Sequence, residues 1–338
     1  MIISPPLARG VRPAPLALGF AALALAGLAG IALGPARLPV GEVLTALVDR
    51  FPAVTADHSL TSRQLDILWQ LRLPRVALGA CVGATLSVCG AAYQGVFRNP
   101  LVDPYLLGVA AGAGLGATLA FAAGGAALVP LAAFVGASGA VVLTYAIGNR
   151  LGDRANTSLI LAGVAVASFL TAAQTFVQQR SSDDLRVVYS WILGRLGGGW
   201  NDVRLVLPYI AISAIVILLH RRLLDVLAVG DSEAQSLGVP VRRVRLLVVI
   251  AATLGTAAAV AVSGLIGFVG IIVPHTVRLL AGPSNRSTLP LSILFGAAFM
   301  VAADLAARTL LAPAELPIGV VTAFFGAPFF LSLLRRKG

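Results

Sequence analysis

The sequence carries few charged side chains, and acidic ones are especially scarce. Asp, Glu, Lys and Arg make up 12% of its 338 residues, about half the roughly 25% that is usual for soluble domains, and only 14 residues are acidic. So few charges cannot cover the surface of a soluble protein of this length, which excludes a soluble globular chain and also a disordered one. Hydrophobic residues make up 58% of the sequence, which predicts a polytopic membrane protein.

Lysine, histidine and cysteine are also rare, and each scarcity excludes a kind of chemistry. The single lysine is Lys337, so the chain has no P-loop, a motif that needs a lysine to hold nucleotide phosphates. The histidines are scattered and form no metal-binding pair. Cys81 and Cys89 are separated along a helix by roughly 12 Å, too far for a disulfide. We therefore expect no metal site and no cofactor bound by this chain.

The 25 basic residues give a net charge of +11, yet they form no patch that would bind nucleic acid. They lie in short gaps between apolar runs, the pattern by which membrane proteins are oriented. With the N-terminus in the cytosol, fifteen bases and five acids fall in cytosolic gaps, against ten bases and nine acids outside. The sequence therefore predicts a chain in the lipid bilayer with cytoplasmic N- and C-termini and no nucleic-acid partner.

Ten apolar runs approach the length of about 20 residues that spans a bilayer. They are Pro15–Gly34, Pro74–Phe97, Tyr105–Ala123, Ala126–Gly148, Ser158–Gln178, Val203–His220, Leu246–Leu265, the short Phe268–Leu280, Leu289–Leu310 and Gly319–Leu334. We predict an all-α membrane protein with ten transmembrane helices in a compact bundle, forming a single polytopic domain over residues 1–338. A cleaved signal peptide is the alternative for the first run, which follows Arg9 and Arg12.

Glycine is abundant, with 36 residues, and several glycines repeat at four-residue spacing. The pairs are Gly30/Gly34, Gly79/Gly83, Gly108/Gly112 and Gly112/Gly116. Such spacing lets helix backbones approach closely in lipid, which favours a compact bundle over independent anchors.

Two segments outside the spans have helical apolar spacing. Val40–Arg50 is predicted to be a surface helix, and residues 181–200 a short amphipathic helix at the outer membrane interface. Trp191 and Trp200 are expected to anchor the second segment at that interface, because tryptophan favours the headgroup level.

The long cytosolic gap at 221–245 contains signals for helix starts and stops. Ser232 and Gln235 have capping-box spacing, Gly238 is a natural helix stop, and Pro240 can open a second short helix. Ala234, Leu237 and Val239 are expected to make apolar contacts. Two short helices at residues 229–245 suggest a docking surface for a soluble partner, and a solvated linker is the alternative.

Two other functions remain open at this point. Ser138 lies in a Gly-Ala-Ser-Gly segment resembling the serine motif of rhomboid intramembrane proteases, for which His275 is the one candidate base. An ion-coupled secondary transporter would need inverted repeats and charges inside spans, and only Asp304 lies inside one.

Four stretches in colinear order resemble one family. They are residues 71–75 (LRLPR) with 93–109 (YQGVFRNPLVDPYLLGV), 230–239 (GDSEAQSLGV), 267–275 (GFVGIIVPH) and 315–322 (ELPIGVVT). They are similar to the permease subunits of ABC importers for iron–siderophores, haem and vitamin B12, over about residues 15–335.

The resemblance implies a type II ABC importer permease fold in the bacterial inner (plasma) membrane. Such a subunit pairs with a second copy of itself and with two cytosolic ABC ATPase subunits, on which ATP and magnesium bind. An extracytoplasmic substrate-binding protein delivers a metal-chelate substrate, with an iron–siderophore the first expectation and vitamin B12 and haem the next.

The resemblance also carries roles over to single residues. It implies that Arg72, Arg75 and Arg308 dock glutamates of the binding protein, since arginine offers a fork of donors to a carboxylate. It places ATPase coupling at Asp231, Ser232, Glu233, Ala234, Gln235, Leu237, Gly238, Val239 and Pro240, and a cytosolic gate at Asn156, Thr157 and Ser158. Gln94 and Arg195 are expected on the pathway. The alternatives are that the arginines mark membrane boundaries, that Arg308 pairs with Asp304 four residues before it, and that residues 156–158 cap the fifth span.

Overall fold

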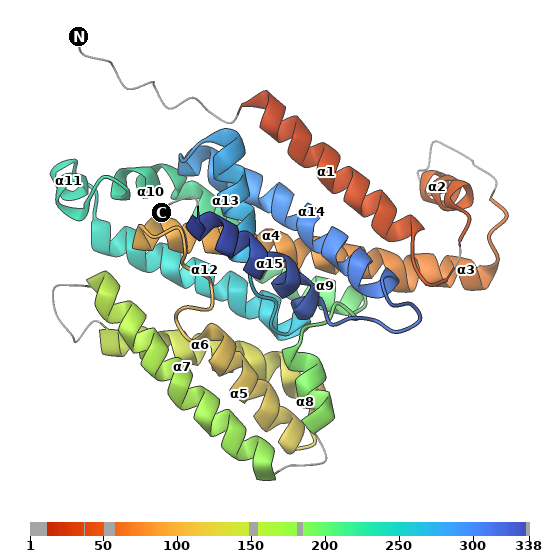
Figure 1. The fold of residues 1–338 in the computed structure, drawn as a ribbon, viewed down its shortest axis with the longest axis horizontal. Coiled ribbons are helices and arrows are strands. Elements are labelled where there is room, and N and C mark those ends of the chain that lie inside the picture. The colour runs from red at the N-terminus through yellow and green to blue at the C-terminus, as the bar shows by residue number, and fades with distance from the viewer. Residues whose placement is uncertain (1–11, 37, 51–57, 149–154, 181–184, 336–338) are drawn as a thin grey trace.

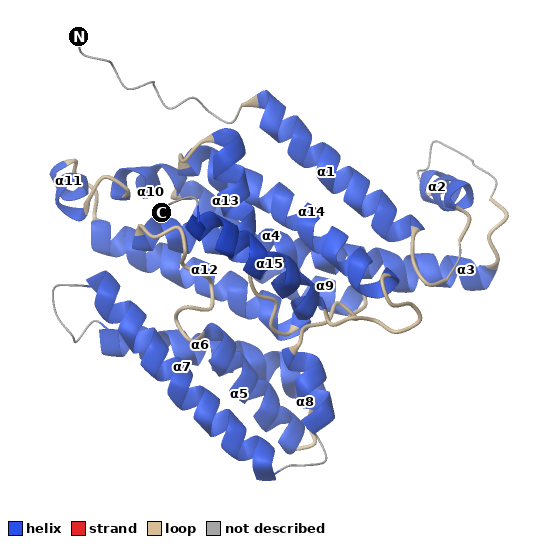
Figure 2. Ribbon diagram, viewed as in Figure 1, coloured by secondary structure: helices blue, strands red, loops and turns tan. Residues whose placement is uncertain are grey.

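The computed structural model describes residues 12–36, 38–50, 58–148, 155–180 and 185–335. Within those ranges every regular element is a helix (Figure 2). The helices are α1 (Pro13–Ala32), α2 (Val40–Asp49), α3 (Ser62–Asp66), the π-helix η1 (Ile67–Arg72), α4 (Leu73–Phe97), α5 (Val109–Ala122), the 3₁₀ turn η2 (Ala126–Leu128), α6 (Val129–Gly148), α7 (Ala155–Arg180), α8 (Leu185–Ile192), α9 (Trp200–Leu219), α10 (Arg221–Leu227), α11 (Asp231–Ser236), α12 (Val241–Ser263), α13 (Val269–Ala281), α14 (Asn285–Thr309) and α15 (Ile318–Arg335).

The predicted spans correspond to helices of the structure. In the part of the chain that is described, seven helical segments are long and apolar enough to cross a membrane, and α5, α13 and α15 are shorter apolar helices. The all-helical fold is therefore confirmed, and the count of ten holds when the three shorter helices are included. The third span is shorter than predicted, because a turn at residues 101–108 precedes Val109.

The second span is longer than predicted, because it begins at Ser62 rather than Pro74 and runs without a break to Phe97. A proline inside an α-helix clashes with the carbonyl of the residue four positions earlier. The π-helical turn η1 lies directly before Pro74 and widens the backbone there, so that the helix continues through the proline.

Helix α4 forms the centre of the bundle, where it packs against α12, α13 and α14. Its closest approaches are made at glycines, because a Cβ at Gly83 would collide with the backbone of Gly296 in α14. A Cβ at Gly90 would likewise collide with Gly270 in α13. Close packing at glycine is the arrangement that the four-residue spacing predicted.

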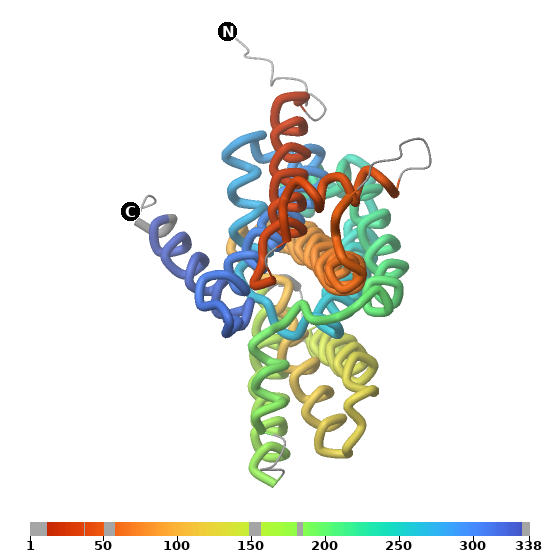
Figure 3. Tube along the Cα trace, turned by 90° about the vertical axis from the view of Figure 1, so that its right-hand side faces the viewer, coloured from red at the N-terminus to blue at the C-terminus, as the bar shows by residue number. Residues whose placement is uncertain are grey.

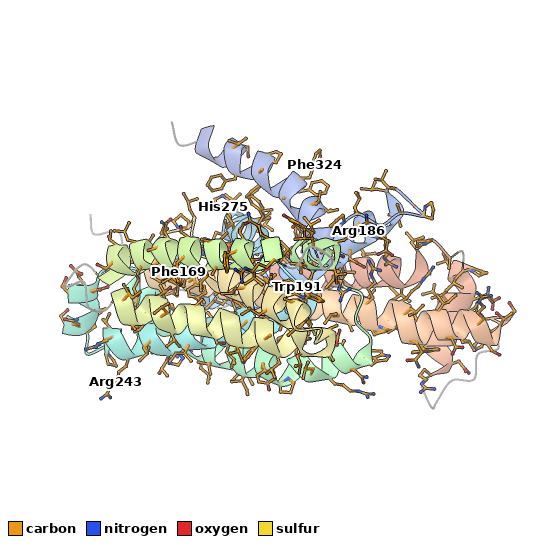
Figure 4. All side chains as sticks on the ribbon, turned by 90° about the horizontal axis from the view of Figure 1, so that it is seen from below. Phe169, Arg186, Trp191, Arg243, His275 and Phe324 are labelled. Carbon is orange, nitrogen blue, oxygen red and sulfur yellow. The ribbon has the colours of Figure 1, made fainter. Side chains whose placement is uncertain are left out.

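Helices α5, α6, α7 and α8 form a second group beside the central one (Figure 1). Gly112 and Gly136 lie backbone to backbone where α5 crosses α6, and Gly116 meets the backbone of Ala132 one turn further on. Helix α15 leans away from the rest of the bundle (Figure 3). Its Phe324 is 78% exposed and projects from that helix (Figure 4).

The two predicted amphipathic segments are helical, as α2 and α8. The prediction that Trp191 anchors α8 at the membrane interface is wrong, because Trp191 is buried among the core side chains. Trp200 is half-buried and donates a hydrogen bond from Nε1 to the carbonyl of Trp69 at 2.8 Å. This contact fixes the start of α9 to the π-helical turn.

The two ends of the bundle carry different elements. Helices α10 and α11 lie at one end, while α2 and α3 lie at the opposite end (Figure 1). The start of α1 and the end of α15 both point toward the α10–α11 end, so the two described termini lie on the same side.

Candidate functional site

Arg72 and Arg308 lie at the α2–α3 end and cap the C-terminus of α1. The last carbonyls of a helix lack partners within the helix and carry partial negative charge. Arg72 Nη1 donates to the carbonyls of Ile31 at 2.8 Å and Ala32 at 2.7 Å, and Arg308 Nη2 donates to the carbonyl of Gly30. Two guanidinium groups distant in sequence therefore complete the hydrogen bonding of α1.

Arg75 forms the second part of the same cluster. Its Nε lies 2.9 Å from Oδ1 of Asp304, and its Nη1 and Nη2 lie 3.1 and 3.0 Å from the two carboxylate oxygens of Glu315. Asp304 also pairs with Arg308 four residues later, with Oδ2 at 3.3 Å from Nε. Arg72, Arg75, Asp304, Arg308 and Glu315 are called the arginine cluster below.

The structure brings the three arginines predicted for docking into one cluster, but it exposes them unequally. Arg72 and Arg308 are 4% and 3% exposed, so neither guanidinium is presented to solvent in this structure. Arg75 is partly open, and its partner Glu315 is exposed. The intrahelical pair of Asp304 with Arg308 is confirmed, and docking to a binding protein stays a prediction.

Arg195 lies beside Arg75 at a small cavity. The cavity has a volume of about 270 Å³, and Arg75, Arg195 and Glu315 all line it. Arg195 is exposed, and its backbone N–H donates to the carbonyl of Ser263 at 2.8 Å. Its side chain thus stands at an opening where a partner or solute can reach it, and its pathway role stays a prediction.

Gln94 does not face open space. It is 3% exposed and donates from Nε2 to the carbonyl of Gly270 at 2.8 Å and to that of Val102 at 3.2 Å. Its Oε1 accepts from Nη1 of Arg278 at 2.6 Å. The side chain therefore ties α4 to α13, and its place on the pathway stays a prediction.

The predicted gate residues lie in the first turn of α7. Thr157 is exposed and Ser158 is buried, whereas the side chain of Asn156 lies outside the described residues. The sequence prediction left a helix cap as the alternative. Residues 149–154, which directly precede α7, are also outside the described part of the chain, so neither role is tested.

At the opposite end, α10 and α11 form what is called here the coupling segment, residues 221–236. The predicted capping box is wrong, because the helix begins at Asp231 and Ser232 lies inside it. Gly230, with φ of 149°, is the N-cap, and the Ser232 hydroxyl donates to the carboxylate of Glu233 at 2.9 Å. Hydrogen bonds from its own backbone N–H and from Ser232 lower the pKa of Glu233, which keeps this exposed carboxylate ionised.

Gly238 ends α11 as predicted, with a positive φ of 80°. Pro240 is the N-cap of the next helix, but that helix is the long span α12 rather than a second short one. The two short helices are instead α10 and α11. Ala234 is buried as expected, whereas the apolar side chain of Leu237 is 70% exposed.

Two aspartates connect the coupling segment to the bundle. Asp231 pairs with Arg245 of α12, with Oδ2 at 2.9 Å from Nη2, and with Arg98 at the end of α4 at 3.3 Å. Asp225 of α10 accepts from Ser284 Oγ at 2.7 Å and from the backbone N–H of Asn285 at 2.6 Å. Sequence reasoning missed Asp225, because its partners lie about sixty residues away and no local motif indicates them.

Ser138 and His275 are in different surroundings. Ser138 lines an apolar groove between α6 and α12, whose described lining residues include no histidine. The ring of His275 in α13 instead packs edge-on against Phe329 of α15, with centroids 5.7 Å apart. No serine–histidine dyad forms between these residues in this structure, and an intramembrane protease is not supported.

A secondary transporter is not supported either. Asp304, the acid that the sequence places within a span, is 2% exposed and held by Arg75 and Arg308. A carboxylate neutralised by two arginines is a poor carrier of a coupling ion.

Known proteins resemble the chain over four fifths of its length or more. The cobalamin import system permease protein BtuC of Halobacterium salinarum is 44% identical, over 80% of this chain and 74% of its own. The hemin transport system permease protein HmuU of Yersinia pestis is 39% identical, over 80% and 85%. The Fe(3+) dicitrate transport system permease protein FecD of Escherichia coli is 35% identical, over 94% and 97%.

A solved metal-chelate type ABC transporter in an inward-facing conformation has the same fold. Its TM-score is 0.82 at 29% identity, and the match covers 96% of this chain and 100% of that one. PsaBC from Streptococcus pneumoniae is similar in fold alone, with a TM-score of 0.56 at 17% identity. The model of the FecCD transport family matches residues 22–336. The chain belongs to the FecCD transport family.

Proposed function

We propose that this chain is the permease subunit of an ATP-driven importer of a metal chelate. The observation that carries the proposal is the fold match to a solved metal-chelate type ABC transporter, which covers 96% of this chain. The relatives named for cobalamin, hemin and ferric dicitrate support the same class of substrate. In this role the chain performs no chemistry itself, and its work is conformational.

The partners proposed are a second copy of the chain, two cytosolic ABC ATPase subunits that bind ATP and magnesium, and an extracytoplasmic binding protein. The coupling segment and the exposed Leu237 support a cytosolic contact. Because both described termini lie toward that segment, we place the N- and C-termini in the cytosol of a bacterial cell, with the chain in the inner membrane. The exposed arginines at that end, of which Figure 4 shows Arg243, agree with the excess of cytosolic bases in membrane proteins.

In the transport cycle, ATP binding closes the paired ATPases and moves the coupling segment. The bundle then alternates between a state open to the binding protein and one open to the cytosol. Arg75 and Arg195 offer charge at the opening where a binding protein would dock, and Thr157 and Ser158 lie toward the cytosolic end, where a gate is proposed. A glutamate of the binding protein would compete with Glu315 for the donors of Arg75.

The substrate class is a metal chelate, and three members should be compared. Iron–siderophore is the expectation from the sequence, and cobalamin and haem are the chelates of two of the relatives named above. The three differ in size and charge, so a direct comparison separates them.

The test is purification of the tagged chain from detergent, followed by reconstitution with its binding protein in lipid vesicles. We expect a Walker-motif ATPase to co-purify at one per permease, and hydrolysis to rise when the binding protein carries its chelate. If the chain purifies without an ATPase and an ion gradient across the vesicle membrane drives solute transport, the importer proposal is wrong. The chain is then a secondary transporter.

A further inference from the structure

The coupling segment is attached to the bundle by a few apolar side chains, of which Leu224, Leu227 and Ala234 are buried in the core. Helix α11 spans six residues, of which Ala234 alone is buried, and α10 spans seven residues with two buried leucines. Helices this short are not stable on their own, so their position depends on contacts with neighbouring elements. The polar contacts of Asp225 and Asp231 therefore add to these apolar contacts and link each short helix to the start or end of a long one.

Asp225 joins α10 to the first turn of α14. Oδ2 accepts from the hydroxyl of Ser284, the N-cap residue, and Oδ1 accepts from the backbone N–H of Asn285. The carboxylate also lies 3.7 Å from Nε of Arg286. A carboxylate at a helix N-terminus satisfies free N–H groups and complements the partial positive charge there. Movement of α10 thus acts directly on the end of α14.

Asp231 joins α11 to α12 and α4. Arg245 is buried, and its Nε has no hydrogen-bond partner among the described residues, so the carboxylate of Asp231 is what balances its charge. Asp231 itself is 38% exposed, but removing it leaves the buried guanidinium of Arg245 uncompensated, which is costly. The pair of Asp231 with Arg98 is solvent-exposed on both sides and contributes less.

We infer that Asp225 and Asp231 are positioning residues that transmit movement of the coupling segment to α14, α12 and α4. This inference rests on the proposed function. The two carboxylates act as mechanical joints within the chain rather than as contacts with the ATPase. Asp225 is half-buried, and its named partners all belong to the start of α14, which supports an internal role.

The experiment uses the assembled complex with its ATPase and binding protein in lipid vesicles. Asp225→Asn and Asp231→Asn keep side-chain volume and remove the charge. We expect both variants to co-purify with the ATPase at the wild-type ratio, and Asp225→Asn, which changes a residue outside those assigned to ATPase coupling, to hydrolyse ATP at the basal rate. We expect the chelate transported per ATP hydrolysed to fall at least about fivefold, as for the loss of a typical coupling free energy between two sites.

Three controls sharpen the result. Asp66→Asn makes the same change at an exposed aspartate of the opposite end and should leave the transport ratio unchanged. Arg98→Gln removes the exposed partner of Asp231 and should reduce the ratio less than Asp231→Asn does. In an Asp225→Cys/Ser284→Cys variant, a short thiol cross-linker joins α10 covalently to the start of α14 in place of the hydrogen bond. Transport per ATP hydrolysed should then return to the wild-type ratio.

Four results would overturn the inference or the proposed function on which it rests. If the variants lose the ATPase during purification, the aspartates belong to the subunit interface and not to an internal joint. If the ratio is unchanged while the wild-type complex couples normally, the inference fails and the proposed function stands. If the cross-linked pair blocks transport, α10 and α14 must separate during the cycle. If the wild-type chain binds no ATPase, the proposed function itself has failed.

Discussion

Replacing Arg72 by glutamine should lower the stability of the bundle rather than weaken docking of a binding protein. The Arg72 guanidinium donates to Ile31 and Ala32 at the C-terminus of α1 and to Ala36 in the loop that follows. It is 4% exposed, so a partner outside cannot reach it without opening this end of the bundle. A glutamine side chain has one amide group and can replace one of these bonds.

The expected size of the effect follows from the bonds lost. A hydrogen bond that involves a charged group contributes about 1.5–3 kcal/mol, and glutamine leaves at least two such bonds unmade. We therefore expect a loss of about 3 kcal/mol or more in the free energy of unfolding. For a chain of 338 residues such a loss lowers the melting temperature by about 4 °C.

The chain provides its own reporter for this measurement. Cys89 is fully buried in α4, so a thiol-reactive fluorophore labels it only when the bundle opens. Thermal unfolding of wild type, Arg72→Gln and Arg75→Gln in the same detergent gives the three melting temperatures. Stimulation of ATP hydrolysis by the loaded binding protein is then measured below the lowest of them.

Arg75→Gln is the matched control, since Arg75 lies one helical turn away and is partly open. We expect this variant to lose most of the stimulation and also to melt below wild type, because it leaves the buried Asp304 with Arg308 as its one arginine partner. If Arg72→Gln melts like wild type and loses the stimulation, Arg72 docks the partner and its role as a cap of α1 is refuted.

Three further predictions concern other parts of the bundle. Gly83→Ala places a Cβ against the backbone of α14 and should cost about 1–3 kcal/mol, whereas Gly27→Ala meets nothing within 4 Å and should melt like wild type in the thiol assay. Gln94→Leu removes the acceptor of Arg278 and should lower the melting temperature by several degrees; Gln94→Glu keeps that acceptor but loses both donations to the carbonyls of Gly270 and Val102, so it should also melt below wild type. Burial raises the pKa of Asp103 to about 6 from an ordinary 3.8, so its contribution to stability is complete below about pH 4 and is lost as the pH rises to about 6. Asp103→Asn should therefore show a smaller fall in melting temperature between pH 4 and 7, and an unchanged profile would contradict the assignment.

The transmembrane helices could be predicted from the sequence because the bilayer sets their length and composition. The stop at Gly238 was predictable as well, since a glycine after a short helix has a local conformational reason to be there. The start of α11 was not, because Ser232 and Gln235 have capping-box spacing while Gly230 lets the helix begin earlier. Local motifs of this kind have more than one solution, and tertiary contacts select among them.

The roles of the buried charges depend on contacts that sequence spacing does not contain. Arg308 caps a carbonyl 278 positions earlier in the chain, and Arg72 caps two that are 40 and 41 positions earlier. The family resemblance predicted that these arginines dock the binding protein. It did not predict which groups within the chain they contact. The same holds for Asp225, whose function becomes visible only when α10 lies against the start of α14.

The central helices connect the two ends of the molecule that the proposed partners would contact. Helix α14 begins at the joint with Asp225 and ends near Arg308 in the arginine cluster, and its 25 residues span roughly 37 Å. Helix α4 begins near Arg75 and ends at Arg98, so it runs between the same two regions. Because glycines bring the backbones of α4 and α14 into contact along this path, the two helices can move as one unit. A displacement of the coupling segment at one end then moves the arginine cluster at the other, without any pathway of small side-chain movements between them.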